Sequence, residues 1–396
     1  MSKHSWPMKK IGDLFDVQLG KMLNEKAKQG DLLPYLANFN VRWGSFNLTQ
    51  LNKMAFSDKE RKKFSLERGD LLMCEGGEIG RCAVWEGADQ PIYFQKALHR
   101  LRPLHRGIKA EFYCYFMQHI ASKGELPKLV GETSIAHLTR EKLICLRVPA
   151  PPLPEQTAIA SLLSTWDLAI EKIERLIAAK EKQFTSLTQE LLHNSTEGLR
   201  HVHLRDICDP VTRKNSINEL NVLTTSAQHG LISQMDYYKK SVSAEDVRGY
   251  YLLKKGEFAY NRSSSNGYPY GAIKRLEDYP QGVLSTLYLC FSLKNDAPCD
   301  SDFMAHAFEA GLLNKQLVGV CQEGARSHGL LNITKTDFFG LKLALPAISE
   351  QRKIAAILTT ARQEIDLLKK QAEAYRRQKR GLMQRLLTGE WRVRVG

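Results

Sequence analysis

Residues 151–192 read PPLPEQTAIASLLSTWDLAIEKIERLIAAKEKQFTSLTQELL, and residues 346–387 read PAISEQRKIAAILTTARQEIDLLKKQAEAYRRQKRGLMQRLL. The two stretches align without a gap at an offset of 195 residues, so that Gln156 falls on Gln351. An internal repeat constrains the architecture more strongly than any single motif does. The chain is therefore expected to consist of two similar halves.

A fainter similarity continues outside the two stretches. Thr139 lies over Thr334 at the same offset, and the sequence RGDL at residues 68–71 resembles KGEF at residues 255–258 after a small shift. The order of parts is therefore head, helix, head, helix. The predicted parts are a first head at residues 1–152, a central helix at 153–195, a second head at 196–347, and a C-terminal helix with its tail at 348–396.

Apolar residues in both stretches recur at alternating steps of four and three, which is the spacing of a coiled-coil seam. One lysine interrupts each seam, Lys180 in the first and Lys379 in the second. Each helix would be about 57 Å long at ~1.5 Å per residue. Two matching seams favour pairing of the helices with each other. Antiparallel pairing, which we favour over parallel pairing, would relate the halves by a pseudo-two-fold axis. The seam residues are Ile159, Leu163, Trp166, Ile170, Ile173, Ile177, Ile354, Leu358, Ile365, Leu368 and Tyr375.

Each head shows short β-like runs between turn signals rather than long helical patterns. The predicted fold class is therefore α+β, with two α/β heads separated by the pair of long antiparallel helices. Residues 111–121 and 302–313 are expected to be helices packed on the sheets. The predicted strands are Tyr35–Val41, Asp70–Cys74, Arg81–Trp85 and Ile92–Phe94 in the first head, and Tyr250–Leu253, Glu257–Asn261, Ala272–Leu276 and Leu287–Leu293 in the second.

The net charge of +14 is unevenly distributed and favours a polyanionic partner. Residues 1–150 carry 24 basic against 16 acidic residues, and residues 350–396 carry 12 against 5. Residues 205–349 are nearly balanced, with 16 against 15. If the second head binds DNA, it must therefore do so through a locally patterned surface.

Several polar, basic and aromatic residues in both heads suit contact with nucleic acid. Arginine pairs with guanine, asparagine and glutamine pair with adenine, and lysine and serine more often hold phosphates. Each segment taken alone fits a solvated turn better, and their occurrence at related places in both heads favours a DNA interface. The candidates are Asn38, Asn40, Arg42, Trp43, Arg61, Lys62, Lys63, Gln95, Lys96 and Ser134 in the first head, and Asn261, Arg262, Ser263, Ser264, Tyr268, Tyr270, Arg326 and His328 in the second.

Motifs that would indicate catalysis are missing from the sequence. It contains no phosphate-binding G-x-x-x-x-G-K-[ST] loop and no N/D-P-P-aromatic tetrapeptide of DNA amino-methyltransferases. The eight cysteines are scattered without a C-x-x-C pair, which argues against a structural metal and is typical of reduced cytosolic thiols. No run approaches the roughly 20 apolar residues of a membrane span. We therefore expect a cytoplasmic protein that binds rather than reacts, with no cofactor or metal of its own.

With two divergent heads, each followed by an E-Q-containing start and a long heptad helix, the chain resembles the specificity subunit of type I restriction-modification enzymes. The resemblance covers essentially the whole chain and is most specific at residues 153–192 and 348–387. It implies that each head reads one part of a split DNA target and that the helices set the gap. It also implies that the helices dock two modification subunits, which carry S-adenosylmethionine and methylate adenine, and that motor-nuclease restriction subunits complete the complex. No catalytic residue falls on this chain.

Two other functions remain open from the residues alone. A coiled-coil scaffold whose heads bind proteins would show the same repeat and would lack salt-dependent affinity for duplex DNA. A stand-alone nuclease or methyltransferase would show activity as a purified single chain, and the missing motifs argue against it.

Overall fold

The computed structural model describes residues 6–22, 30–126, 137–193, 198–226, 230–239, 246–265, 267–320, 322–323 and 331–394. The chain forms two compact units: unit 1 comprises residues 1–175 with 370–396, and unit 2 comprises residues 176–369. The boundaries fall inside the long helices rather than at their starts. Each unit therefore contains one head together with a segment of both helices. In the described parts of the chain, no helix is long and apolar enough to cross a membrane.

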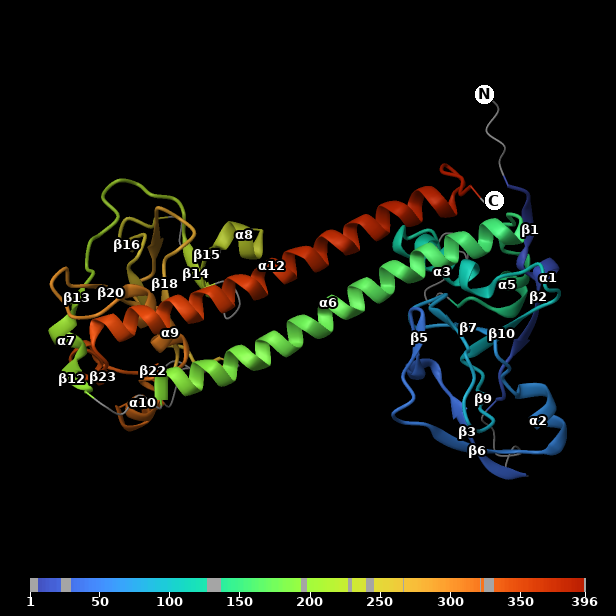
Figure 1. The fold of residues 1–396 in the computed structure, drawn as a ribbon, viewed down its shortest axis with the longest axis horizontal. Coiled ribbons are helices and arrows are strands. Elements are labelled where there is room, and N and C mark those ends of the chain that lie inside the picture. The colour runs from blue at the N-terminus through green and yellow to red at the C-terminus, as the bar shows by residue number, and fades with distance from the viewer. Residues whose placement is uncertain are drawn as a thin grey trace. The chain divides into compact units, whose positions relative to one another are not determined.

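The two long helices are α6 (Leu153–His193) and α12 (Ile348–Leu387) (Figure 1). In unit 1, Asp167 of α6 pairs with Lys379 of α12, and Glu174, further along α6, pairs with an α12 residue that comes earlier. In unit 2, Glu181 of α6 pairs with Lys369 of α12, and Phe184, further along α6, contacts Arg362, which comes earlier in α12. The predicted antiparallel pairing is confirmed within each unit. The pseudo-two-fold relation between the halves stays a prediction.

The inner part of the first head is a four-stranded antiparallel sheet of order β2-β10-β7-β8. A further pair, β1 with β11, joins the beginning of the head to its end. Helix α3 covers this sheet, and the short helices α1 and α5 contact each other beside it. The bounds are β1 Met8–Lys10, α1 Ile11–Leu14, β2 Phe15–Leu19, β7 Leu71–Cys74, β8 Cys82–Val84, β10 Leu98–Pro103, α3 Ala110–Ser122, α5 Arg140–Cys145 and β11 Arg147–Pro149.

The outer part of the first head is a three-stranded sheet of order β6-β3-β9, in which β3 and β9 are parallel. In Figure 1 this sheet lies on the side of the head away from α6. It has its own core, which includes Tyr35, Phe56, Phe64 and Phe94. The bounds are β3 Asp31–Leu36, a 3-10 turn at Asn38–Asn40, β4 Val41–Arg42, β5 Ser45–Phe46, β6 Asn52–Phe56, α2 Asp58–Phe64 and β9 Tyr93–Phe94.

The inner part of the second head repeats the first strand for strand. Its four-stranded sheet has the order β13-β20-β17-β18, and β12 pairs with β23 as β1 pairs with β11. The confirmed fold class is α+β with two heads. The bounds are β12 Arg200–His203, α7 Leu204–Ile207, β13 Cys208–Pro210, β17 Phe258–Asn261, β18 Ala272–Arg275, β20 Leu289–Leu293, α9 Ser301–Glu309, α10 Asn314–Val320, α11 Lys335–Phe339 and β23 Lys342–Leu345.

The outer part of the second head differs from that of the first. It consists of two antiparallel pairs, β14 with β15 and β16 with β19, and a single parallel bridge between Val222 and Val283 links the two pairs. The bounds are β14 Leu223–Ser226, β15 Gly230–Ser233, α8 Gln234–Tyr238, β16 Tyr251–Lys254 and β19 Gln281–Leu284, with a further short pair of β21 Gln322–Glu323 and β22 Leu331–Asn332.

Three local predictions differ from the structure. The predicted strand Tyr35–Val41 ends at Leu36, because the Ala37 N–H donates to the Asn40 side chain at 2.9 Å and closes a turn. The predicted helix at residues 302–313 ends at Glu309, two residues before Gly311 takes a φ of +73°. The third is strand β10, which was missed because its sequence, LHRLRP, includes His99 and Arg100; both are buried despite their polarity.

Both long helices complete the core of each head. In unit 1, Ile159 and Leu163 of α6 and Leu386 of α12 are buried in the core of the first head. In unit 2, Ile354 and Leu358 of α12 are buried in the core of the second head, against partly buried residues of α6. The seam residues near the helix starts therefore pack on a head as well as on the other helix.

Further along the pair, the seam joins helix to helix directly. Trp166 meets Tyr375 edge to face, with ring centroids 5.6 Å apart. Lys379, which interrupts the seam in the sequence, is buried and donates to Asp167 at 2.5 Å. The remaining seam residues are buried (Ile173, Ile365) or half-buried (Ile170, Ile177, Leu368).

Candidate nucleic-acid interface and its supports

Four exposed cations lie on the outer part of the first head. Arg42 lies on the β4–β5 hairpin, whose turn uses Gly44 at a φ of +73°. Lys62 and Lys63 lie in the last turn of α2, and Lys96 follows β9. These four side chains are exposed and make no ion pair with any described residue. They are the candidates that the structure leaves available to a polyanion, and their contact with DNA stays a prediction.

The basic triplet that begins at Arg61 is not a loop, as its composition indicated, but the end of helix α2. The helix starts at Ser57, whose backbone N–H donates to Glu60 at 2.9 Å in a capping box. Arg61 is turned to Asp31 in an ion pair. The helix therefore displays the two lysines while the arginine holds it to strand β3.

Asn40 is a structural residue, which corrects its place among the DNA candidates. Its side chain is 1% exposed, and both amide hydrogens donate at 2.9 Å, to the carbonyls of Asn47 and Gln50. Its Oδ1 accepts from the Ala37 N–H. Nothing of this amide is left for a base.

Two neighbouring candidates, Asn38 and Trp43, also form hydrogen bonds to other residues of the head. Asn38 donates to the Gly76 carbonyl at 2.9 Å and accepts from Arg81 at 2.8 Å, so it fastens the β7–β8 turn. Trp43 is half-buried, and its indole donates to Glu78 at 2.5 Å. The structure therefore brings these two candidates together at one turn, through an arginine that sequence reasoning did not select.

Gln95 lies at the junction of the two sheets of the first head. It is half-buried and forms a parallel bridge with Lys21. Lys21 is itself only 3% exposed and donates to Glu60 at 2.7 Å and to the Ala55 carbonyl at 2.6 Å. These bonds lower the pKa of Glu60, although burial alone acts in the opposite sense. The sequence did not predict this role of Lys21, because a single lysine carries no signal that it is buried.

In the second head, the guanidinium of Arg262 donates to two backbone carbonyls. Its Nε donates to Leu287 O at 2.8 Å and its Nη1 to Ile333 O at 3.4 Å. Asn261 is half-buried, and its side chain accepts from the Ser263 N–H at 3.2 Å. The exposed candidate in this loop is Ser264. Hydrogen bonds within the head therefore hold Asn261 and Arg262 in place, and these side chains support the turn.

The two tyrosines of the same loop, which are also DNA candidates, contact the interior of the second head. The Tyr268 hydroxyl donates to Glu309 at 2.5 Å and accepts from buried Lys274 at 2.8 Å. Burial and Glu309 together raise the pKa of Tyr268. Tyr270 packs against the core of the second head. The remaining candidates, Ser134, Arg326 and His328, lie outside the described residues.

The faint RGDL and KGEF repeat has a structural cause. The Asp70 carboxylate accepts from the Glu67 N–H at 2.7 Å, and the Glu257 carboxylate accepts from the Lys254 N–H at 2.8 Å. In each case an acidic side chain closes the turn three residues before it. Each carboxylate also receives an arginine, Arg102 for Asp70 and Arg213 for Glu257. The same turn therefore supports the sheet of each head.

A glutamine at the start of each long helix fastens the helix to its head. The buried Gln156 amide donates to the carbonyls of Pro151 at 2.8 Å and Gly107 at 3.2 Å, and its Oε1 accepts from the Lys109 N–H at 2.9 Å. Gln351 makes the same set in unit 2: it donates to Pro346 O at 2.8 Å and Pro298 O at 3.0 Å, and accepts from Asp300 N–H at 2.9 Å. We call this arrangement the glutamine clamp.

The glutamate beside the clamp behaves differently in the two units. Glu155 is buried and binds the guanidinium of Arg392, from the chain after α12, at 2.7 and 2.5 Å. This pairing raises the pKa of Arg392. Glu350, at the equivalent position, pairs at 3.3 Å with Lys353 of its own helix. The glutamine of the E-Q pair therefore has the same role in both units. The glutamate binds the segment after α12 in unit 1 only.

Comparisons with known proteins show which proteins this chain is similar to. Residues 3–181 match the family model described as the type I restriction modification DNA specificity domain. Two relatives come from Methanocaldococcus jannaschii. The putative type I restriction enzyme MjaX specificity subunit is 22% identical, over 98% of this chain and 94% of its own. The MjaVIII specificity subunit is 23% identical, over 98% and 93%.

Solved structures share the fold along the whole chain. The type I restriction-modification S subunit of M. genitalium aligns with a TM-score of 0.56 at 17% identity and covers 98% of this chain and 97% of its own. A chain from a study of complex assembly and conformational transition in a type I R-M system aligns with a TM-score of 0.58 at 14% identity, over 98% and 99%.

Proposed function

Since the chain belongs to the type I restriction-modification specificity subunits, we propose that it gives such a complex its DNA specificity by reading a two-part target, one part with each head. The observation that carries this proposal is the contrast within the heads. Their inner sheets share one strand order, whereas their outer parts differ in strand pairing and the two heads differ in net charge. A repeated support with two different outer surfaces suits two different half-sites.

In this proposal the first head binds chiefly through charge. Its exposed cations Arg42, Lys62, Lys63 and Lys96 lie on its outer part, and phosphate contacts of this kind fix register while carrying little sequence information. The second head, nearly balanced in charge, would rely on shape and local polar contacts. Because the proposed partner is duplex DNA, we propose that the protein is cytoplasmic.

We propose further that the chain is a non-catalytic subunit. Modification subunits would bind S-adenosylmethionine and methylate adenine, and restriction subunits would move along and cut the DNA. The helices α6 and α12 would dock two modification subunits and set the spacing of the half-sites. A helix of about 57 Å spans between one and two duplex turns of ~34 Å, which suits this ruler role.

Exchange of one head tests the two-part reading. The second head, residues 196–347, is replaced by that of a relative with a different target, and the chain is expressed with its modification subunits. Mapping of methylated adenines should then show one half-site changed and the other kept. The reciprocal replacement of residues 1–152 should change the opposite half. A change in both halves after one exchange contradicts the proposal, and a lack of any salt-dependent affinity for duplex DNA would favour a protein scaffold instead.

Lengthening the helix pair tests the ruler. One heptad inserted after Arg175 and one after Lys369 keeps the seam in register and adds about 10 Å at ~1.5 Å per residue. The expected result is a spacer longer by about three base pairs at ~3.4 Å each, with both half-sites unchanged. An unchanged spacer in the methylation map would remove the ruler role and leave the two-part reading intact.

A further inference from the structure

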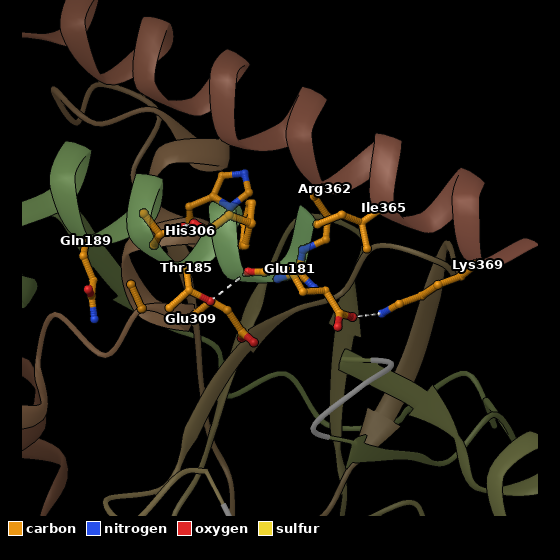
Figure 2. A pocket seen from close by; sticks show the side chains of 11 residues that line it. Glu181, Thr185, Gln189, His306, Glu309, Arg362, Ile365 and Lys369 are labelled. Atoms are coloured by element: carbon orange, nitrogen blue, oxygen red, sulfur yellow. Dashed lines mark hydrogen bonds and ion pairs between the residues drawn. The ribbon is translucent and has the colours of Figure 1, made fainter. Parts of the chain in front are cut away.

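Unit 2 contains a cavity of about 370 Å³ where α6, α9 and α12 meet. Its apolar wall includes Phe184 and Ile365, and Thr185, Thr188 and Gln189 of α6 also line it. Figure 2 shows the polar rim, where Glu181 pairs with Lys369 at 2.8 Å. The volume is within the range of sites that accept a small ligand or a side chain. We call it the junction pocket.

One cation of the junction pocket has no anionic partner. Arg362 lies over the Phe184 ring, 4.9 Å from its centroid, and forms no ion pair with any described residue. The two rim carboxylates are already neutralised, because Glu181 binds Lys369 and Glu309 binds Lys274. The pocket therefore offers one uncompensated positive charge beside an aromatic face.

The repeat shows what the equivalent place looks like when it is filled. At the offset of 195 residues, Arg362 corresponds to Asp167, which binds Lys379 and accepts from the Tyr115 hydroxyl at 2.7 Å. Thr188 corresponds to Met383, which is 5% exposed in the core of unit 1. Unit 1 thus balances its charge internally and fills its space with a longer side chain. Unit 2 has a shorter side chain and an unbalanced arginine at the same positions.

From these contacts we infer that the junction pocket receives an acidic side chain, aspartate or glutamate, of a protein that packs on the helix pair. A single carboxylate would balance Arg362, and its aliphatic stem would lie against Phe184 and Ile365. This inference rests on the proposed function, in which that protein is a modification subunit. It adds that the two ends of the helix pair are chemically different docking places.

Duplex DNA fits the junction pocket less well than an acidic side chain does. The duplex carries one negative charge per ~1.7 Å of axis and needs several cations to hold it. The pocket supplies one uncompensated cation, because Lys369 and Lys274 are already paired with Glu181 and Glu309. A single carboxylate matches this one charge, whereas a row of phosphates does not.

The test compares full-length variants in titrations with purified modification subunit and, separately, with a duplex of the target sequence. Arg362→Gln removes the charge and keeps most of the stem, and Thr188→Met introduces the residue of unit 1. Arg362→Lys keeps the charge. Arg248→Gln, on an exposed side chain of the same unit paired with Asp246, is the control for net charge. Unchanged hydrogen exchange in the second head establishes that a variant is folded.

We expect Arg362→Gln and Thr188→Met to weaken binding at one of the two subunit sites by about 10- to 100-fold, as truncation of a buried interface charge does. Arg362→Lys should weaken it by less, and Arg248→Gln should leave it unchanged. Two full-affinity sites in both test variants would overturn the inference while leaving the proposed function standing. Loss of DNA affinity without loss of subunit affinity would assign the pocket to phosphate and overturn it equally. A wild-type chain that binds neither subunit nor DNA would overturn the proposed function itself.

Discussion

The inner and outer parts of the two heads have diverged to different degrees. The inner sheets, β2-β10-β7-β8 and β13-β20-β17-β18, keep one strand order, and a glutamine clamp fastens a long helix beside each of them. The outer parts are less alike: one is a three-stranded sheet with a parallel pair, and the other is two antiparallel pairs linked by one parallel bridge. The strand order is therefore kept where a head joins the helices, and the strand pairing differs in the outer parts, where we propose the contacts with DNA.

The helix pair shows a second contrast, in which the positions are kept but the chemistry is reversed. At the offset of 195 residues, Glu174 corresponds to Lys369 and Arg376 to Glu181. Both combinations form ion pairs, Glu174 with Arg376 in unit 1 and Glu181 with Lys369 in unit 2. The two units therefore form an ion pair between α6 and α12 at equivalent positions, but the acidic and basic residues are exchanged. The positions are the same in the two units, and the charges of the side chains are reversed.

The largest effect is expected at the shared glutamine clamp. Gln156→Ala or Gln351→Ala leaves buried backbone groups without partners, which should lower the free energy of unfolding of the affected unit by about 2–4 kcal/mol. All five tryptophans lie in unit 1, so tryptophan fluorescence in urea should respond to Gln156→Ala and not to Gln351→Ala. Hydrogen exchange of β17 and β20 should show the reverse.

The control for the clamp is Gln183→Ala on the exposed face of α6, which should change stability by no more than about 0.5 kcal/mol. Clamp variants as stable as this control would show that the two joints are held by apolar packing alone.

A smaller effect is expected at the Asp167–Lys379 pair, which distinguishes unit 1 from unit 2. Asp167→Ala leaves the Lys379 ammonium buried without its carboxylate. Because Asp167 itself is about half exposed, the expected loss is about 1–3 kcal/mol, below that of a fully buried pair. Adding Lys379→Met should restore most of the loss in the urea transition of the tryptophan signal. A double variant less stable than the single one would contradict this account.

The reversed ion pairs should have a still smaller effect. Arg376→Glu places a carboxylate beside those of Glu174 and Glu373 and should cost up to about 1 kcal/mol, since all three side chains are partly exposed. The double change Glu174→Arg with Arg376→Glu reverses the charges of the Glu174–Arg376 pair and should recover the part of the loss that comes from this pair. A double-mutant cycle on the free energies of unfolding measures the coupling, and zero coupling would mean that the reversal has no structural weight.

The smallest effect is a pH dependence at His306 in unit 2, whose counterpart in unit 1, Tyr115, does not titrate in this range. Burial, and then the charge of Arg362, lower the pKa of His306 below its ordinary value of 6.5. Between 6.5 and that lower pKa the unfolded chain binds more protons than the folded chain. The free energy of unfolding of unit 2 should therefore fall as the pH drops below about 6.5 and level off under the folded pKa.

His306→Gln should flatten this dependence in hydrogen exchange of the second head between pH 5 and 7. The tryptophan signal of unit 1, where burial lowers the pKa values of His99 and His119, should keep its own slope. An unchanged slope in the second head would assign the titration to another group.

The sequence predicted the parts of the molecule that repeat or are periodic. The helices α6 and α12 and the head-helix order follow from heptad spacing and the gapless offset, and the inner strands β7, β8, β17, β18 and β20 follow from short apolar runs between turn signals. Polar residues that hold the fold together could not be predicted, because buried Asn40 and Lys21 and half-buried Arg262 look like surface residues until long-range carbonyls and carboxylates are placed around them. The candidate DNA residues were therefore selected by chemistry alone, and several of them support the heads instead.

The glutamine clamp has one more consequence. Every partner of Gln156 and Gln351 is a backbone carbonyl or N–H, and no side chain of the head takes part. These hydrogen bonds therefore do not depend on the side chains of the head. When genetic recombination joins a foreign head to the same helix pair, we expect the clamp to form unchanged, so that only the apolar packing of the helix starts on the head has to be matched.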